Sequence, residues 1–195
     1  MVIIEGKIIR SVVELSHQLL SPVVHEGSSV IDATAGNGKD TLFLAKLVGE
    51  TGKVYAFDIQ EGAIEKTQSL LETHGMKNRV HLIQHGHELV DEYVDEQVQG
   101  VLFNLGYLPG GDHKIVTSPD TTICALKKSL NLLAQGGVLS IAVYWGHPGG
   151  LEEKNVVDQW VEKLSPREWD VMKINFPNKN MAPYVIGVQK KLWEA

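Results

Sequence analysis

The sequence predicts an α/β fold with a doubly wound, seven-stranded sheet whose last strand is antiparallel. Three observations support this prediction. Apolar runs suited to buried strands alternate with segments of helical spacing, which is typical of a parallel sheet covered on both faces. A Gly-rich loop follows the first apolar run. The last two runs, 169–176 and 184–190, are joined only by a loop, and strands joined in this way pair antiparallel.

The elements follow one another in a regular order. Residues 1–28 carry charges spread among apolar residues and lack a small-residue cleavage site, so we expect a helical lead-in and not a signal peptide. No linker, repeat or low-complexity tract interrupts the 195 residues, so we expect one domain over 1–195. We expect the other strands at 29–33, 53–58, 79–84, 100–105 and 138–144, and helices at 39–48, 61–74, 119–134 and 152–164.

Charge and composition limit the possible functions. The net charge of -6 disfavours broad, sequence-blind binding to nucleic acid, although a local basic patch could still bind RNA. Residues 101–195 hold 10 Lys and Arg against 9 Asp and Glu, so the acidic excess lies in the first hundred residues. No apolar run is long enough for a bilayer, and the single cysteine suits a reducing cytoplasm.

The loop after the first strand, DATAGNG at 32–38, predicts a ligand site. Its two glycines let the backbone turn sharply against a ligand, and the helix that begins near Lys39-Asp40-Thr41 directs its amides there. A dinucleotide site would show a third glycine where Thr41 stands. Asp32 would also repel a pyrophosphate, whereas it suits a ligand with a cationic amino acid end. The alternative is a plain turn between strand and helix.

The next two strand ends support the same ligand. Asp58 lies 20 residues after Gly38, where a carboxylate can accept hydrogen bonds from both ribose hydroxyls. Taken alone, Asp58 would be an ordinary helix N-cap. The segment His85-Gly86-His87-Glu88 follows the third strand, at the height of an adenine. Its histidines could instead be exposed loop residues.

The fourth strand ends on a carboxamide, in the run FNLGYLPGGD. Asn104 closes a buried run, and Tyr107 follows three residues later. Ligands of doubly wound sheets sit beyond the carboxyl ends of the strands, so both side chains would face the site. An amide can accept a hydrogen bond from an incoming amine, and a phenol can stack on a flipped base. A polar strand end beside a buried tyrosine is the alternative.

Together, IDATAGNGKDTLFLA, FDIQ, HGHE and NLGYLPGGD resemble one family, the small bacterial proteins labelled rRNA methylases, of the MnmM (YtqB) type. The resemblance implies the class I methyltransferase (Rossmann-like) fold and S-adenosylmethionine as cofactor. It also implies a homodimer that methylates the amine of wobble 5-aminomethyl-2-thiouridine in the anticodon loop of tRNA. Lys39 stands where a histidine is expected, a modest departure. We expect the cofactor to contact Asp32, Gly36, Asn37, Gly38, Asp40, Thr41, Asp58, Gln60, Gly86, His87 and Glu88.

Acceptor chemistry is assigned to the later strand ends. Asn104 and Tyr107 are the predicted catalytic pair, and Asp112, Tyr144 and His147 are candidate helpers at the acceptor. No group of Cys and His has metal-ligand spacing, so we expect no metal. The C-terminal hairpin region holds several cations that could contact tRNA phosphates, among them Arg167 and Lys179 as the chosen pair, with Lys173, Lys190 and Lys191.

Three other functions remain open. The same fold could methylate rRNA, a protein or a small-molecule amine, and the acidic balance slightly favours the small molecule. An NAD-dependent oxidoreductase is disfavoured by the missing third glycine. A catalytically silent module that binds the cofactor structurally would have no need of the NLGY run.

Overall fold

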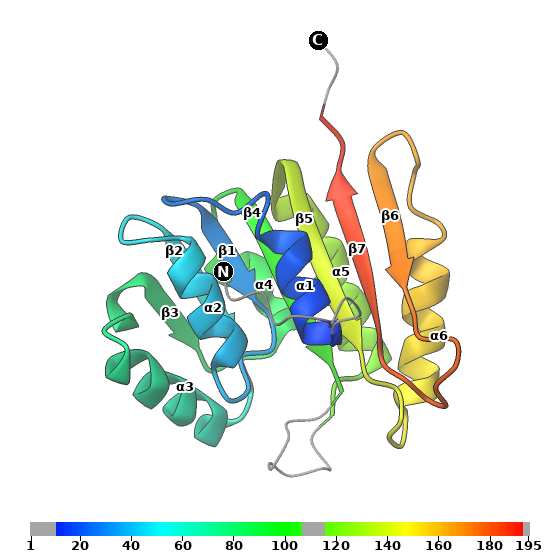
Figure 1. Cartoon of the computed structure of the whole chain (residues 1–195), viewed down its shortest axis with the longest axis horizontal. Coiled ribbons are helices and arrows are strands. Elements are labelled where there is room, and N and C mark those ends of the chain that lie inside the picture. The colour runs from blue at the N-terminus through cyan, green and yellow to red at the C-terminus, as the bar shows by residue number, and fades with distance from the viewer. Residues whose placement is uncertain (1–10, 107–115, 193–195) are drawn as a thin grey trace, which may run out of the picture.

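The computed structural model describes residues 11–106 and 116–192 of the chain. Seven strands form one sheet in the order β3-β2-β1-β4-β5-β7-β6 (Figure 1). The strands are β1 (Ser29–Asp32), β2 (Lys53–Phe57), β3 (Val80–Ile83), β4 (Val98–Leu105), β5 (Leu133–Val143), β6 (Trp169–Ile174) and β7 (Tyr184–Lys190). The α-helices are α1 (Val12–Leu20), α2 (Lys39–Leu47), α3 (Glu61–Thr73), α4 (Val90–Tyr93), α5 (Pro119–Leu132) and α6 (Gly150–Val161), with single 3-10 turns at Lys77–Arg79 and His87–Leu89.

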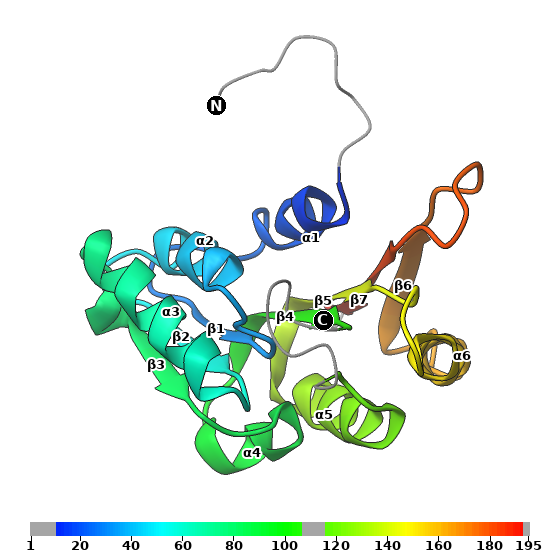
Figure 2. The ribbon, with the colours of Figure 1, turned by 90° about the horizontal axis from the view of Figure 1, so that it is seen from below.

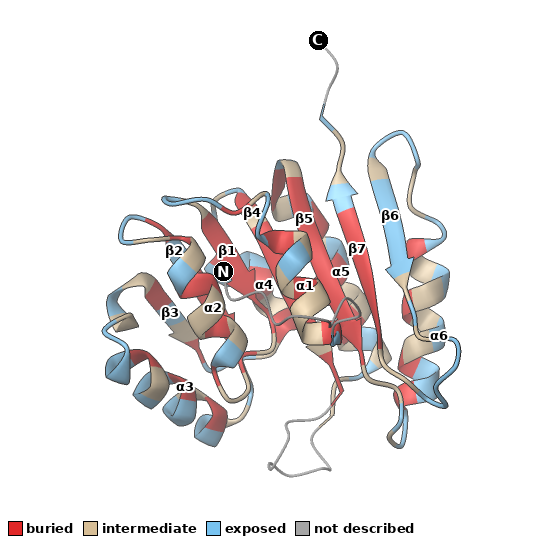
Figure 3. Ribbon diagram, in the orientation of Figure 1, coloured by how far each residue is buried: buried red, intermediate tan, exposed pale blue. Residues whose placement is uncertain are grey.

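The helices cover both faces of the sheet. Helices α1, α2 and α3 pack on one face, where Leu20, Leu44 and Leu71 are fully buried against the strands. Helices α4, α5 and α6 cover the other face (Figure 2). β1 is buried along its whole length and β4 and β5 are mostly buried, as expected for a sheet covered on both sides, whereas the edge strand β6 is largely exposed (Figure 3).

Strand direction places the functional end of the sheet. β1 pairs in parallel with β2 and β4, and β4 with β5, so their carboxyl ends meet at one edge, the lower edge in Figure 1. β7 runs antiparallel between β5 and β6. The class I methyltransferase topology predicted from the alternating elements and the final hairpin is therefore confirmed.

Several element boundaries differ from the prediction: β5 begins at Leu133 and not at 138, α6 covers Gly150–Val161 and not 152–164, and β6 ends at Ile174 and not at 176. The helix expected to continue to 134 ends at Leu132, because Leu133 already has an extended backbone (φ -64°, ψ 128°) and pairs with Val98. The four-residue α4 was not predicted, since so short a segment shows no helical period. Within residues 11–28 of the lead-in the helix is α1, whose N-terminus has a capping box formed by Ser11 and Glu14. No helix in the described ranges is long and apolar enough to span a bilayer.

Candidate active site

A pocket of about 780 Å³ lies at the carboxyl ends of the parallel strands. Its wall is made by the loops that follow β1, β2, β3, β4 and β5, together with one residue of α1 and the β6–β7 hairpin. Eleven residues expected from the sequence line it: Gly36, Asn37, Asp40, Asp58, Gln60, Gly86, His87, Glu88, Asn104, Tyr144 and His147.

The glycine loop is held open by the neighbouring strand. Gly36 and Gly38 both have positive φ, 56° and 78°, and Gly38 is the N-cap of α2. The amide of Gly36 donates to Asp58 Oδ2 at 2.9 Å, and the hydroxyl of Thr67 on α3 donates to the Gly36 carbonyl at 3.2 Å. The loop is thus fixed from two sides, and the pocket side of its backbone stays available to a ligand.

Asp58 accepts a hydrogen bond from the glycine loop and also lines the pocket. Its Oδ1 accepts from the Gln60 amide at 2.9 Å, so each carboxylate oxygen holds one backbone N–H. Each oxygen keeps a further lone pair for another donor. A carboxylate arranged in this way can accept hydrogen bonds from two vicinal hydroxyls, as the ribose prediction requires.

Asp32 and Thr41 lie behind the pocket wall. Both are fully buried, and Thr41 Oγ1 donates to Asp32 Oδ2 at 2.6 Å. Neither residue lines the pocket, and nor does Gly38, although all three were expected to contact the cofactor. Complete burial, with the nearby charge of Asp40, raises the pKa of Asp32 to about 7. In this structure Asp32 supports the loop from below.

The raised pKa of Asp32 makes stability depend on pH. The folded-state pKa lies above the ordinary value of 3.8, so this group's contribution is present below about pH 4 and is lost as pH rises toward 7. The change amounts to on the order of a few kcal/mol. In Asp32→Asn this dependence should be absent. Urea unfolding at about pH 5 and pH 8 should show the variant gaining on the wild type at the higher pH. A constant difference would contradict the assignment.

Asn104 is held by two hydrogen bonds, one from its backbone and one from its side chain. Its backbone amide donates to Thr34 Oγ1 at 2.8 Å, and its side-chain Nδ2 donates to Asp40 Oδ2 at 2.8 Å. The carbonyl oxygen of the amide is therefore the atom left to accept from a ligand. Tyr144 follows the neighbouring strand β5, and burial, with the charge of Asp40, raises the pKa of its phenol. Tyr144 consequently keeps its proton as a possible donor.

His87 is suited to reading a flat, polar ligand. The carbonyl of Ala33 accepts from its Nδ1 at 3.2 Å, which leaves a lone pair on Nε2. Burial lowers the pKa of His87, so the ring is neutral at pH 7. Nε2 is buried and has no hydrogen-bond partner within the described residues. It can accept from an exocyclic amino group of a purine.

Two predicted residues, Tyr107 and Asp112, lie outside the described residues. The chain on either side of them is fixed: the Thr117 amide donates to the Gly106 carbonyl at 3.0 Å, and the Gly106 amide donates to Thr117 Oγ1 at 3.0 Å. Thr117 Oγ1 in turn donates to the buried carboxylate of Glu153 on α6 at 2.7 Å. Gly106 and Thr117, on either side of the undescribed residues, therefore lie together at the pocket.

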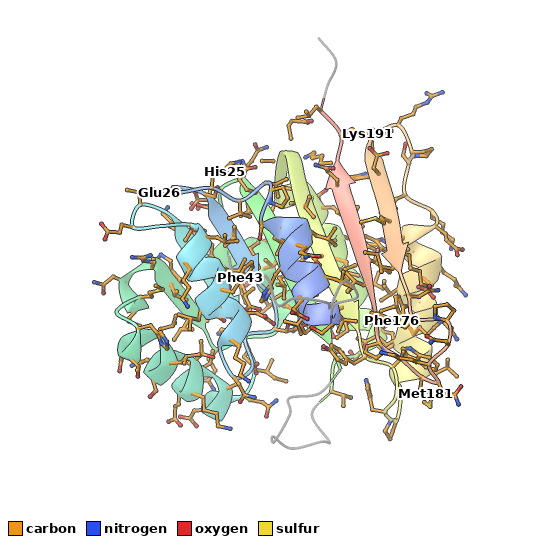
Figure 4. The ribbon with its side chains drawn as sticks, in the orientation of Figure 1. His25, Glu26, Phe43, Phe176, Met181 and Lys191 are labelled. Carbon is orange, nitrogen blue, oxygen red and sulfur yellow. The ribbon has the colours of Figure 1, made fainter. Side chains whose placement is uncertain are left out.

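The structure places Arg167 and Lys179, which were expected to contact tRNA together, at opposite edges of the sheet. β6 runs parallel to β5, so Arg167 precedes it at the opposite edge of the sheet and Lys179 follows it at the pocket edge. Six residues of strand, roughly 20 Å, separate the two ends. Figure 4 shows Phe176 and Met181 of the hairpin at the lower edge and Lys191 at the upper edge. Closeness in sequence did not mean closeness in space.

The other cations of the hairpin region are engaged within the protein. Lys173 bonds Asp158 at 2.8 Å, Lys190 donates to the Leu133 carbonyl at 2.7 Å, and Lys191 pairs with Asp170 at 3.2 Å. Lys179 lies over the ring of Phe176, with its Nζ 4.9 Å from the centroid. Of the two cations chosen from the sequence, Lys179 is the one placed to meet a ligand at the pocket edge.

Several residues of the site carry no sequence signal. Val13 of α1 and Met181 of the hairpin line the pocket far from any motif. Met181 is the one non-glycine residue with positive φ, 49°, in the part of the chain described. Thr34 lies inside the DATAGNG loop, and its contact with Asn104 could have been found only from the pairing of β1 with β4. In the described ranges no group of three or more His, Cys, Asp or Glu is placed to hold a metal ion.

The comparisons with known proteins agree with this geometry. A family profile described as "Putative rRNA methylase" matches residues 54–190. The chain belongs to this family. An Arabidopsis thaliana protein named tRNA (mnm(5)s(2)U34)-methyltransferase, chloroplastic, is 43% identical over 91% of this chain and 69% of its own length. The family predicted from the four motifs is therefore confirmed.

Two solved structures are similar to this protein in both fold and sequence. A Clostridium thermocellum protein of the same description superposes with a TM-score of 0.92, at 43% identity, over 94% of this chain and 100% of its own. A Streptococcus mutans protein, solved in complex with S-adenosylhomocysteine (SAH), gives a TM-score of 0.86 at 42% identity over 94% and 99% of the two chains.

Proposed function

We propose that this protein is an S-adenosylmethionine-dependent tRNA methyltransferase. It methylates the amine of wobble 5-aminomethyl-2-thiouridine to give 5-methylaminomethyl-2-thiouridine. Methyl transfer follows from the family and the fold. The tRNA substrate is supported by the printed name of the Arabidopsis relative.

The observation that carries this proposal is the position of Asn104. It lies at the end of β4 in the same pocket as Gly36 and Asp58, with its Nδ2 held by Asp40 and its carbonyl oxygen left to accept. An amine that donated an N–H to this oxygen would be held at the end of β4, and its lone pair would remain available to the methyl group that bound S-adenosylmethionine would supply. A hydroxyl nucleophile would usually need a base to remove its proton, whereas a neutral amine needs none.

The polar groups of the pocket are of the kinds that the cofactor requires. Asp58 can hold the ribose hydroxyls, His87 Nε2 can accept from the adenine amino group, and the Gly36 loop leaves room for the amino acid end. Bound S-adenosylmethionine supplies an electrophilic methyl group on a sulfonium. Asn104 then aligns the amine behind that methyl, and alignment of two reactants can supply on the order of 7–11 kcal/mol of barrier reduction.

Two features of the pocket act in opposite directions on the protonation state of the amine. Desolvation disfavours a charged ammonium, and the pocket lining includes apolar side chains such as Val13, Leu105 and Met181. The carboxylate of Asp40 opposes this effect, since an anion favours a nearby cation. In this proposal Asp40 accepts a hydrogen bond from Asn104 and does not contact the amine. The amine donates to the carbonyl oxygen of Asn104.

Charge at the pocket edge predicts how tRNA binds. Lys179→Glu should weaken the affinity for tRNA severalfold, because one phosphate contact is replaced by repulsion, and should lower the salt slope by about 0.7. Arg167→Glu, at the opposite edge, is the matched control and should leave binding unchanged. Filter binding of both variants over a range of salt concentrations measures this. Equal losses in the two variants would contradict the assignment of the pocket edge to tRNA.

The proposal is tested by comparing acceptors directly. Purified protein with radiolabelled S-adenosylmethionine is offered tRNA bearing the 5-aminomethyl group, ribosomal RNA, or the free modified nucleoside. We expect label in tRNA, little in the nucleoside, which offers no phosphates, and none in ribosomal RNA. Preferred labelling of ribosomal RNA or of the nucleoside would overturn the tRNA proposal.

We place the reaction in the cytoplasm. The homodimer stays a prediction, which sedimentation of the purified protein can test.

A further inference from the structure

A polar chain runs from the first helix into the reaction site. His17 on α1 contacts Asp40 on α2, with Nε2 and Oδ1 2.6 Å apart. Asp40 Oδ2 in turn accepts from Asn104 Nδ2 at 2.8 Å. His17 and Asp40 are largely buried, with 24% and 14% of their side-chain surface exposed. Three side chains from three separate elements are thereby joined in one line that ends at the acceptor amide.

Asp40 decides which way the amide of Asn104 points. A carboxylate has only acceptor atoms, so it can bond the NH₂ of the amide and would repel its carbonyl oxygen. The observed orientation, with Nδ2 on Asp40, therefore leaves the carbonyl oxygen for the ligand. If Asp40 turned away, the amide could rotate by 180° and present a donor where the amine needs an acceptor.

His17 fixes Asp40 in turn. The oxygen of Asp40 accepts, so the imidazole Nε2 donates, and short hydrogen bonds to ionised groups are among the stronger ones. The imidazole is itself clamped, since it stacks on Phe43 with ring centroids 3.6 Å apart and planes inclined by 7°. Figure 4 shows Phe43 on α2. Helix α1 reaches the pocket through Val13, one turn before His17 on the same helix face.

We propose that His17 is a positioning residue for methyl transfer, acting through Asp40 to hold the carbonyl oxygen of Asn104 toward the substrate amine. The inference rests on the proposed function and deepens it. The helix that carries His17 lies outside the segment matched by the family profile, which begins at residue 54. A merely structural pair would tie α1 to α2 and affect only stability, so the test must separate these two roles.

Two substitutions divide the imidazole's contacts. His17→Phe keeps a ring to stack on Phe43 and removes the donor to Asp40, whereas His17→Gln keeps an N–H donor and removes the ring. His17→Phe should lower kcat on tRNA about tenfold to hundredfold, the scale expected for small misalignment. It should leave the affinity for SAH, measured by calorimetry, unchanged. His17→Gln should restore most of kcat. His25→Phe, on an exposed loop at the opposite edge, is the matched control.

A double-mutant cycle shows whether His17 acts through Asn104. If it does, adding His17→Phe to Asn104→Ala should cost little further activity in single-turnover assays. Additive losses would overturn the proposal, and so would an unchanged kcat in His17→Phe with only a lowered melting temperature. In either case tRNA methylation by the wild type would still support the proposed function.

A readout without catalysis separates the two failures. The side-chain NH₂ of Asn104, observed by ¹⁵N NMR, should shift in His17→Phe and not in His25→Phe. If these signals shift but the wild type methylates no tRNA, His17 still positions Asn104 and the proposed substrate is wrong. If the signals stay in place in His17→Phe, the positioning role is wrong whatever the substrate.

Discussion

Asn104→Ala should lower kcat on tRNA about hundredfold or more, because the proposed role of this carboxamide is to align the amine, and alignment counts most in the transition state. Cofactor affinity should stay unchanged, since we assign cofactor binding to Asp58 and the Gly36 loop, and neither bonds the Asn104 side chain. Single-turnover rates at saturating tRNA, with SAH affinity by calorimetry, measure the two effects separately.

The control for this substitution is Asn155→Ala, the same change on an exposed position of α6. It should alter neither rate nor affinity. A variant at position 104 that lost cofactor affinity and kept its rate on the bound complex would assign Asn104 to the cofactor, and the mechanism given above would be wrong.

Gly38→Ala should cost roughly 2–5 kcal/mol of stability, the sum of left-handed strain and overpacking. Gly38 has φ +78°, and a Cβ there would lie 2.8 Å from Thr67 Cα, a backbone atom of α3 that cannot turn aside. Either the loop or α3 must move, and the loop carries the Gly36 amide. The affinity for S-adenosylmethionine should therefore fall with the melting temperature.

Two further glycines separate strain from contact. Gly75 also has positive φ, +67°, but nothing lies within 4 Å of a Cβ there, so Gly75→Ala should cost only the strain, about 1–2 kcal/mol. Gly62 in α3 has open space and ordinary φ, so Gly62→Ala should stabilise by roughly 0.5–1 kcal/mol. Equal losses in Gly38→Ala and Gly75→Ala would show that contact with α3 is unimportant.

The fold was predictable because its signals are local. Each strand of the parallel sheet is a short apolar run, and the final hairpin shows itself by the absence of a helix between two such runs. The strand ends then follow, because parallel strands bring Asp32, Asp58 and Asn104 to one edge whatever the packing details. Local patterns did not predict the short elements or the exact element ends. α4 is too short to show a helical period, and α5 ends where Leu133 begins to pair with β4.

The finer parts of the site depend on contacts that no local pattern encodes. The sequence position of Asp32 predicted an acid that contacts the ligand. In the structure Asp32 is fully buried behind the loop, where Thr41 of α2 donates to it. His17 and Asp40 are 23 residues apart on two helices, and nothing in either helix predicts their contact. Arg167 and Lys179 looked like one patch until the direction of β6 separated them.

The most direct test of the central claim is the chemical position of the transferred methyl group. Undermodified tRNA is incubated with the protein and S-adenosylmethionine carrying a trideuterated methyl group, then digested to nucleosides and analysed by mass spectrometry. We predict that 5-aminomethyl-2-thiouridine from the wobble position gains one trideuteromethyl group, and that fragmentation places it on the side-chain amine. Label on a ring nitrogen, on a ribose or on any other nucleoside would contradict the assignment of Asn104 as the group that receives the amine.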